Sequence, residues 1–232
     1  MNPTVLFWSR NPDHFLWFDH ILGQEGFRSK LVDAQSLVPA IKEAKTISIL
    51  FDAEEQSEEV CDLCEVIRND KSNAYLPLIA MIPAGNDDGC LNLLKAGIDE
   101  CFVRPLSPAR ILNYLHALID SNWTVGQPTE IQSAYRAFHE ITLDTTRREV
   151  KFHDKKMQLG SIEFRLLSCL IDAPGRVFSR RELIEAGWPQ NQIVQSRTVD
   201  VHMGRLRRAL THLLNKTIIR TIRSAGYAIE WD

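Results

Sequence analysis

The stretch SRTVDVHMGRLRRAL, residues 196–210, has the spacing of an amphipathic helix. At about 100° per residue, its apolar side chains share one stripe, formed by Val199, Met203, Leu206 and Leu210. The opposite face carries basic and small side chains: Arg197, Thr198, Val201, Arg205 and Arg208. Such a face suits the major groove of DNA, where arginine pairs with guanine edges or phosphates, and threonine and valine methyls contact thymine.

The sequence around this helix decides between a DNA-binding face and an ordinary solvated basic face. Upstream, SRRELIEAGW places Ser179 and Glu182 at capping-box spacing, which predicts a second helix in series. Downstream, KTIIRTIRSAGYAIEW alternates on both sides of a turn and predicts a hairpin with Arg223 near its tip. Arg207 lies to the side of the basic face and suits a flanking phosphate, whereas His202, at its edge, suits packing or a phosphate contact. Helix, loop, basic helix and basic hairpin together favour a DNA-reading module.

Composition indicates a globular protein of two domains. The chain has 232 residues, of which 44% are apolar and 25% charged, and no apolar run is long enough to cross a bilayer. No export signal begins the chain, so we expect a cytoplasmic protein without a membrane partner. Residues 1–120 hold 10 Lys and Arg against 18 Asp and Glu, whereas residues 121–232 hold 17 against 12. Only the second half therefore favours a polyanion.

The first half alternates apolar runs with helix-like segments. Strands are expected at 5–8, 30–32, 47–51, 76–82 and 100–103, and helices at 13–24, 37–44, 58–69, 88–96 and 108–118. This order predicts an α/β fold, a doubly wound five-stranded parallel sheet, because parallel neighbours need helical crossovers. The polar stretch after residue 120 reads as a linker. We therefore predict a regulatory domain at 1–120, a linker at 121–136 and a small α+β domain at 137–232.

The second domain resembles the C-terminal winged-helix domain of the OmpR/PhoB response regulators. The resemblance lies in LGSIEFRLLSCLIDAPGRVFSRRELIEAGW, RTVDVHMGRLRRAL and IIRTIRSAGYAI. It implies that residues 197–208 form a recognition helix, that Arg223 in the wing reaches a minor groove, and that PQNQIVQ is the loop through which relatives touch RNA polymerase. Gly204 departs from the pattern, because relatives usually carry a second arginine beside Arg205. Glycine removes that contact and costs a helix about 1 kcal/mol relative to alanine.

Residues 1 to about 119 resemble the receiver domain that precedes the winged helix in this family. The phrases QEGF and KAGIDECFVRPLSPARIL carry this resemblance. A receiver needs a phosphoacceptor aspartate, two further acids for Mg²⁺, a Thr or Ser, and a Lys. In this chain Ser9 and Arg10 stand at the acidic pair, Ile82 or Pro83 at the hydroxyl, and Arg104 at the lysine. Asp52 is the only candidate acceptor, and a one-residue offset leaves its placement open.

A cation at a metal-ligand position repels Mg²⁺, so we expect poor metal binding and no cofactor. We hypothesise that Arg10 or Arg104 pairs with Asp52 and fills the site that metal and phosphate would occupy. The alternative is that these are ordinary loop residues of a domain retained for dimerisation. Both interpretations predict a degenerate pocket formed by Ser9, Arg10, Asp52, Ile82, Pro83 and Arg104.

The family resemblance also suggests a homodimer through the fourth helix, fifth strand and fifth helix of the first domain. That region offers charges of both signs: Asp87, Asp88, Lys95, Asp99, Glu100 and Arg110. The sequence thus predicts a sequence-specific, phosphorylation-independent transcription regulator that binds double-stranded DNA as a dimer. Two other functions remain open: a conventional regulator phosphorylated on Asp52, and a regulator whose first domain senses a small molecule or a partner protein. No enzymatic constellation competes with these.

Overall fold

The computed structural model describes residues 2–43, 45–53, 57–70, 72–73, 75–119, 135–145, 147–189 and 194–231. The chain divides into two compact units, Met1–Ile119 and Asp120–Asp232, which are described separately below. The predicted linker, 121–136, lies outside the described residues up to position 134. Within the described part of the chain, no helix combines the length and apolarity that crossing a membrane requires.

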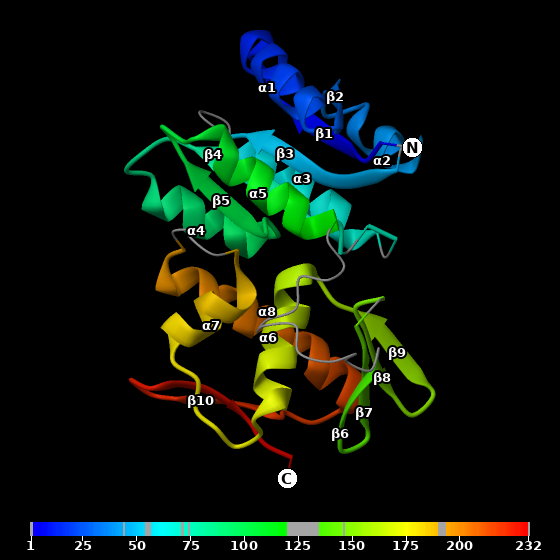
Figure 1. The fold of residues 1–232 in the computed structure, drawn as a ribbon, viewed down its shortest axis with the longest axis vertical. Helices are drawn as coiled ribbons and strands as arrows, with labels where there is room; N and C mark the ends of the chain where they lie inside the picture. Colours follow the sequence, from blue (N-terminus) through cyan, green and yellow to red (C-terminus); the bar gives the residue numbers. More distant parts are fainter. Residues whose placement is uncertain are drawn as a thin grey trace. The chain divides into compact units, whose positions relative to one another are not determined.

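The first unit is the predicted doubly wound parallel sheet (Figure 1). Its strands are β1 (Thr4–Trp8), β2 (Arg28–Val32), β3 (Thr46–Asp52), β4 (Leu78–Ile82) and β5 (Glu100–Val103), in the order β2-β1-β3-β4-β5. The helices are α1 (Pro12–Gln24), α2 (Leu37–Glu43), α3 (Ser57–Asn69), α4 (Asp87–Ala96) and α5 (Pro108–Ile119). Every registered strand pair is parallel, which confirms the predicted fold class.

Burial on both faces of the sheet explains its continuous apolar runs. All five residues of β4 are buried. Alternate residues of a strand point to opposite faces, and Val5 and Phe7 of β1 pack in one cluster with residues of α1 and α5. Trp8 points the other way and meets Phe51 of β3, with ring centroids 6.1 Å apart. The carboxyl ends of β1, β3, β4 and β5 consequently lie along one edge of a rigid sheet.

The second unit is an α+β domain with two antiparallel sheets. A four-stranded sheet comprises β6 (Tyr135–Phe138), β7 (Ile141–Asp144), β8 (Glu149–Phe152) and β9 (Lys155–Gln158). Three helices follow, α6 (Ser161–Asp172), α7 (Arg180–Gly187) and α8 (Ser196–Leu214), and the hairpin of β10 (Ile219–Ile222) and β11 (Gly226–Ile229) forms the wing. This arrangement confirms the predicted winged helix-turn-helix.

One strand falls partly inside the stretch predicted as linker. β6 starts at Tyr135 and pairs with β7 in antiparallel register, from Tyr135 opposite Asp144 to Phe138 opposite Ile141. Its four residues are too few to show a convincing period of their own. The strand forms because β7 satisfies its backbone donors and acceptors and because Phe138 is buried in the core.

Candidate functional site

Asp52 lies at the centre of a polar cluster at the carboxyl edge of the parallel sheet. It is the last residue of β3 and only 4% exposed. Ser9 follows β1, His14 stands in the first turn of α1, and Arg104 follows β5. Sites of doubly wound sheets gather at this edge, because parallel strands deliver their side chains there together. Asp52 therefore stands at the end of β3 beside Ser9, His14 and Arg104, and its identity as a phosphoacceptor stays a prediction.

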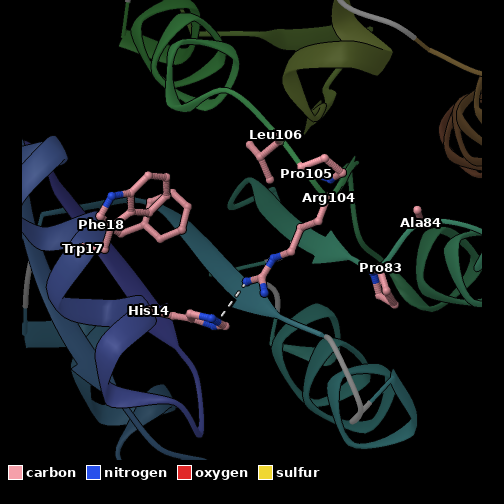
Figure 2. A pocket seen from close by; sticks show the side chains of 8 residues that line it. All are labelled: His14, Trp17, Phe18, Pro83, Ala84, Arg104, Pro105 and Leu106. Atoms are coloured by element: carbon pink, nitrogen blue, oxygen red, sulfur yellow. Dashed lines mark hydrogen bonds between the residues drawn. The ribbon is translucent and has the colours of Figure 1, made fainter.

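Three donors converge on the Asp52 carboxylate. Arg104 Nη2 lies 2.7 Å from Oδ1, while Ser9 Oγ and His14 Nδ1 lie 2.8 Å and 2.7 Å from Oδ2. An ionised carboxylate only accepts hydrogen bonds, so His14 must carry a proton on Nδ1. Arg104 Nη2 also approaches His14 Nδ1 to 3.5 Å, as Figure 2 shows. The cluster therefore neutralises a buried negative charge from within the chain.

The hypothesis of an internal cation is correct for Arg104 and wrong for Arg10. Arg10 turns away from Asp52, and its Nη2 binds Glu59 Oε2 of α3 at 2.6 Å, with an Arg10 side chain that is 64% exposed. Solvation explains this outcome: β1 ends before Arg10, so the flexible side chain keeps its charge in water and finds an exposed carboxylate. Arg104, by contrast, has a 21% exposed side chain and is held at the sheet edge.

The other predicted pocket residues line the same edge without contributing polar atoms. Ile82 is the last residue of β4 and is buried, while Pro83 follows it and is partly exposed. Neither residue carries a hydroxyl. Sequence reasoning missed His14. Asn11 is the N-cap of α1 and Pro12 is its first residue. A proline at the first position of a helix is a common start signal, so this pair could have predicted that His14 lies in the first turn of α1, close to the end of β1.

The second candidate site is the outer face of α8. The predicted inner stripe is confirmed, since Val199, Met203, Leu206 and Leu210 are all at most 1% exposed. α7 begins with the predicted capping box, in which Ser179 and Glu182 bind each other's backbone amides. Both features hold α8 against α6 and α7 in the core of the second unit. The outer side of the helix is therefore positioned by packing, not by its own charge.

Asp200 links α7, α8 and the wing strand β11 through hydrogen bonds. It projects from α8, where its Oδ1 accepts hydrogen bonds from Arg180 Nε of α7 at 2.8 Å and from Tyr227 Oη of β11 at 2.7 Å. Burial and the bond to Asp200 raise the pKa of Tyr227 to about 12, so the phenol stays a donor at neutral pH. Arg207 makes a second contact between α8 and the wing, because its Nε donates to the Ile219 carbonyl of β10 at 3.1 Å. Helix and wing are thus linked through polar contacts.

The predicted DNA-contacting residues differ in exposure. Arg197, Arg208 and Arg223 are exposed, and Arg223 stands in the turn between β10 and β11 as predicted. Val201, Arg205 and Arg207 are partly buried, and Arg207 serves the wing contact described above. Thr198 and His202 are buried, so their DNA-contacting role stays a prediction that the structure does not directly support. Most of the loop predicted to touch RNA polymerase lies outside the described residues.

His202 of α8 takes part in a buried ion pair. Its Nδ1 lies 2.8 Å from Glu163 Oε1 of α6, and Arg205 Nη1 lies 3.8 Å from the same oxygen. Burial tends to raise the pKa of Glu163, but the neighbouring His202 and then Arg205 outweigh it and lower this pKa to about 2. The Glu163 carboxylate is therefore ionised throughout the neutral range and binds the middle of α8 to α6.

Comparison with known proteins shows the family to which this chain belongs. A family model described as the C-terminal part of transcriptional regulatory proteins matches residues 154–229. The phosphate regulon transcriptional regulatory protein PhoB of Rhizobium meliloti is 35% identical over 169 residues, 73% of this chain and 72% of that protein. PhoB of Klebsiella pneumoniae is 28% identical over 210 residues, 89% of each chain. The solved structure of a RitR mutant matches 99% of this chain and all of its own, with a TM-score of 0.68 and 18% identity, which shows the shared fold.

The fold and the sites define a two-unit DNA-binding transcription regulator with a receiver-like first unit and a winged-helix second unit. The chain belongs to the OmpR/PhoB family of response regulators. This is a family of transcription factors, not of enzymes, in agreement with the sequence.

Proposed function

We propose that this regulator acts without phosphorylation of its first unit. The observation that carries the proposal is the occupation of Asp52 by Arg104, His14 and Ser9, with all contacts between 2.7 and 2.8 Å. A phosphoryl group added to this carboxylate would have to displace three donors from a nearly inaccessible side chain. It would also bring further negative charge to a buried position.

The residues around Asp52 do not fit Mg²⁺. A hard dication needs several oxygen ligands, mostly carboxylates, at about 2 Å. In the described residues the side chains that meet Asp52 are a hydroxyl, an imidazole and a guanidinium. Arg10, at a position where receivers carry an acid, points to Glu59 instead. Among the described residues that meet Asp52, the metal that supports phosphoryl transfer in receivers would therefore find one carboxylate, where a receiver site has three.

Acetyl phosphate tests this proposal directly. The full-length protein is incubated with acetyl phosphate and Mg²⁺ and examined by intact-mass and peptide mass spectrometry, with Asp52→Asn as the control for site assignment. We expect no adduct, and unchanged DNA binding by the treated protein. A stoichiometric phosphoryl adduct on Asp52 would overturn the proposal in favour of a conventional regulator.

We further propose that the protein binds DNA through Arg197, Arg208 and Arg223, supported by Thr198, Val201, His202, Arg205 and Arg207. The support for this is the exposure of the first three side chains on a helix and wing that Asp200 and Arg207 join. Sites are selected from a random DNA pool, and binding is then measured at several salt concentrations. Arg208→Ala should reduce the slope of log K against log salt by about 1. Lys155→Ala, an exposed cation on β9, should leave the slope unchanged; an equal effect of both variants would contradict the assignment.

A homodimer through α4, β5 and α5 also remains a proposal. Fewer charged side chains are available for contacts across its interface than the sequence suggested. Asp87, Asp88 and Lys95 are exposed on α4. Asp99, however, binds Arg68 of the same unit at 2.8 Å, and Glu100 is only 3% exposed. A dimer suits repeated half-sites on DNA. Sedimentation of untreated protein should show a dimer at micromolar concentration, and a monomer there would contradict it.

RNA polymerase is the remaining proposed partner, through the loop PQNQIVQ at 189–195. Transcription in vitro from a selected site should lose activation when this loop is replaced, while DNA binding persists. Loss of both together would assign the loop a structural role instead.

A further inference from the structure

A cavity of about 450 Å³ opens at the sheet edge beside the Asp52 cluster. Figure 2 shows its walls: Trp17 and Phe18 from α1 on one side, Pro83 and Ala84 after β4 on the other, and Leu106 after β5. The guanidinium of Arg104 and the ring of His14 face each other at one end. Its volume lies within the range of sites that hold small organic molecules.

The apolar wall of this cavity includes an aromatic ring that no part of the described chain fully covers. Trp17 is 50% exposed, whereas its neighbour Phe18 is 3% exposed and packs edge-on against it at 4.9 Å between centroids. An indole left half in water is stabilised by any flat apolar group that covers it. Pro83 and Leu106 are also partly exposed within the cavity. The walls therefore favour a ligand with a planar apolar body.

The polar end of the cavity offers nitrogen donors. Among the described residues that line the cavity, His14 and Arg104 carry the ionisable side chains, and none is acidic. Asp52, which is not among the residues that line the cavity, accepts from His14 Nδ1 and Arg104 Nη2 and so holds the two side chains in place. Arg104 thus brings a fixed positive charge and planar N–H groups to this end of the cavity. A carboxylate matches such planar donors better than a neutral amide does.

We propose that this cavity binds a small aromatic carboxylic acid, with its ring against Trp17 and Leu106 and its carboxylate at the Arg104–His14 end. The proposal goes beyond the proposed function, because a receiver that ignores phosphate need not bind any small molecule. Such a ligand would reach the same sheet edge at which relatives with a complete acidic site respond to phosphate. Binding of this ligand could then regulate the first unit in place of phosphorylation.

Titration of the full-length protein by NMR tests this site. The probes are benzoate and indole-3-acetate, each compared with its uncharged amide, and inorganic phosphate as an anion without an apolar body. The indole signal of Trp17, assigned by its loss in Trp17→Phe, reports on the cavity. We expect both acids to shift this signal and to bind at least about tenfold more tightly than their amides or phosphate.

Matched variants locate the binding. Trp17→Ala, followed by the signals of the acids themselves because it lacks the indole, should weaken their binding at least about tenfold. Ala84→Phe, at an exposed position, should block binding by filling the cavity. Leu16→Ala removes an adjacent exposed side chain that does not line the cavity and should change nothing. The proposal is overturned if neither acid moves the Trp17 signal at about 10 mM, if amides or phosphate bind equally well, or if these variants leave binding intact. The acetyl phosphate experiment does not depend on this result, so the two proposals fail separately.

Discussion

Replacing Arg104 by methionine tests the central contact of the first unit. Methionine keeps an unbranched apolar stem but removes the guanidinium that lies 2.7 Å from Asp52 Oδ1. Asp52 is 4% exposed, so its carboxylate cannot recover this partner from bulk water. The variant leaves a buried charge with two of its three side-chain donors.

The structure sets the size of the expected effect. Two charges 4 Å apart attract by about 4 kcal/mol at the effective dielectric of a protein, and breaking a buried pair from one side typically costs 3–5 kcal/mol. Ser9 and His14 still bind Oδ2 and offset part of this loss. We therefore expect Arg104→Met to lower the free energy of unfolding of the first unit by about 2–3 kcal/mol. The double variant Asp52→Asn/Arg104→Met should recover at least about 1 kcal/mol of it.

Urea unfolding followed by NMR separates the two units. The indole signal of Trp8, 3% exposed in β1, reports on the first unit, and that of Trp188, 1% exposed beside α7, reports on the second. Arg10→Met is the matched control, since it breaks only the exposed Arg10–Glu59 pair and should cost at most about 0.5 kcal/mol.

Three outcomes would refute this reasoning. Equal losses for Arg104→Met and Arg10→Met would mean that the Asp52 contact is no stronger than a surface ion pair. Strict additivity of the Asp52 and Arg104 substitutions would mean that the two side chains do not interact energetically. A transition of Trp188 that moves together with that of Trp8 would show that the variant acts outside the first unit.

Three further predictions concern the second unit. Because the pKa of Glu163 is about 2 in the folded protein against 4.5 as its ordinary value, its ion pair with His202 stabilises the fold above pH 4.5. On the order of 3 kcal/mol should be lost as pH falls from 4.5 toward 2, and Glu163→Gln should flatten this part of the stability curve measured by thermal unfolding at each pH. Gly204→Ala should stabilise α8 by about 1 kcal/mol, seen as a higher Tm, because an added methyl meets no atom within 4 Å. Gly226→Ala should destabilise the wing by more than about 2 kcal/mol in urea unfolding, because φ is +153° and the added carbon would lie 1.9 Å from the Phe178 carbonyl oxygen; an unchanged midpoint would contradict this.

The sequence alone was sufficient for features that depend on local periodicity. The apolar stripe of α8, the Ser179–Glu182 capping box and the hairpin near Arg223 all appear where the pattern predicts them. The alternation of apolar runs and helices likewise predicted the parallel sheet. These features can be predicted from sequence because the side chains that determine them lie within a few residues of each other and repeat with the period of a helix or a strand.

Tertiary structure alone decided which groups meet Asp52. Arg104 lies 52 positions away from it and His14 lies 38, so no local pattern relates them. In the strand order β2-β1-β3-β4-β5, β1 neighbours β3, whereas β5 is separated from it by β4. Arg104 nevertheless reaches Asp52, because its long side chain crosses the end of β4, where Pro83 presents no competing polar group. The sequence predicted a receiver-like parallel sheet for the first unit, which the structure confirms, and packing at the sheet edge decided which cation meets Asp52.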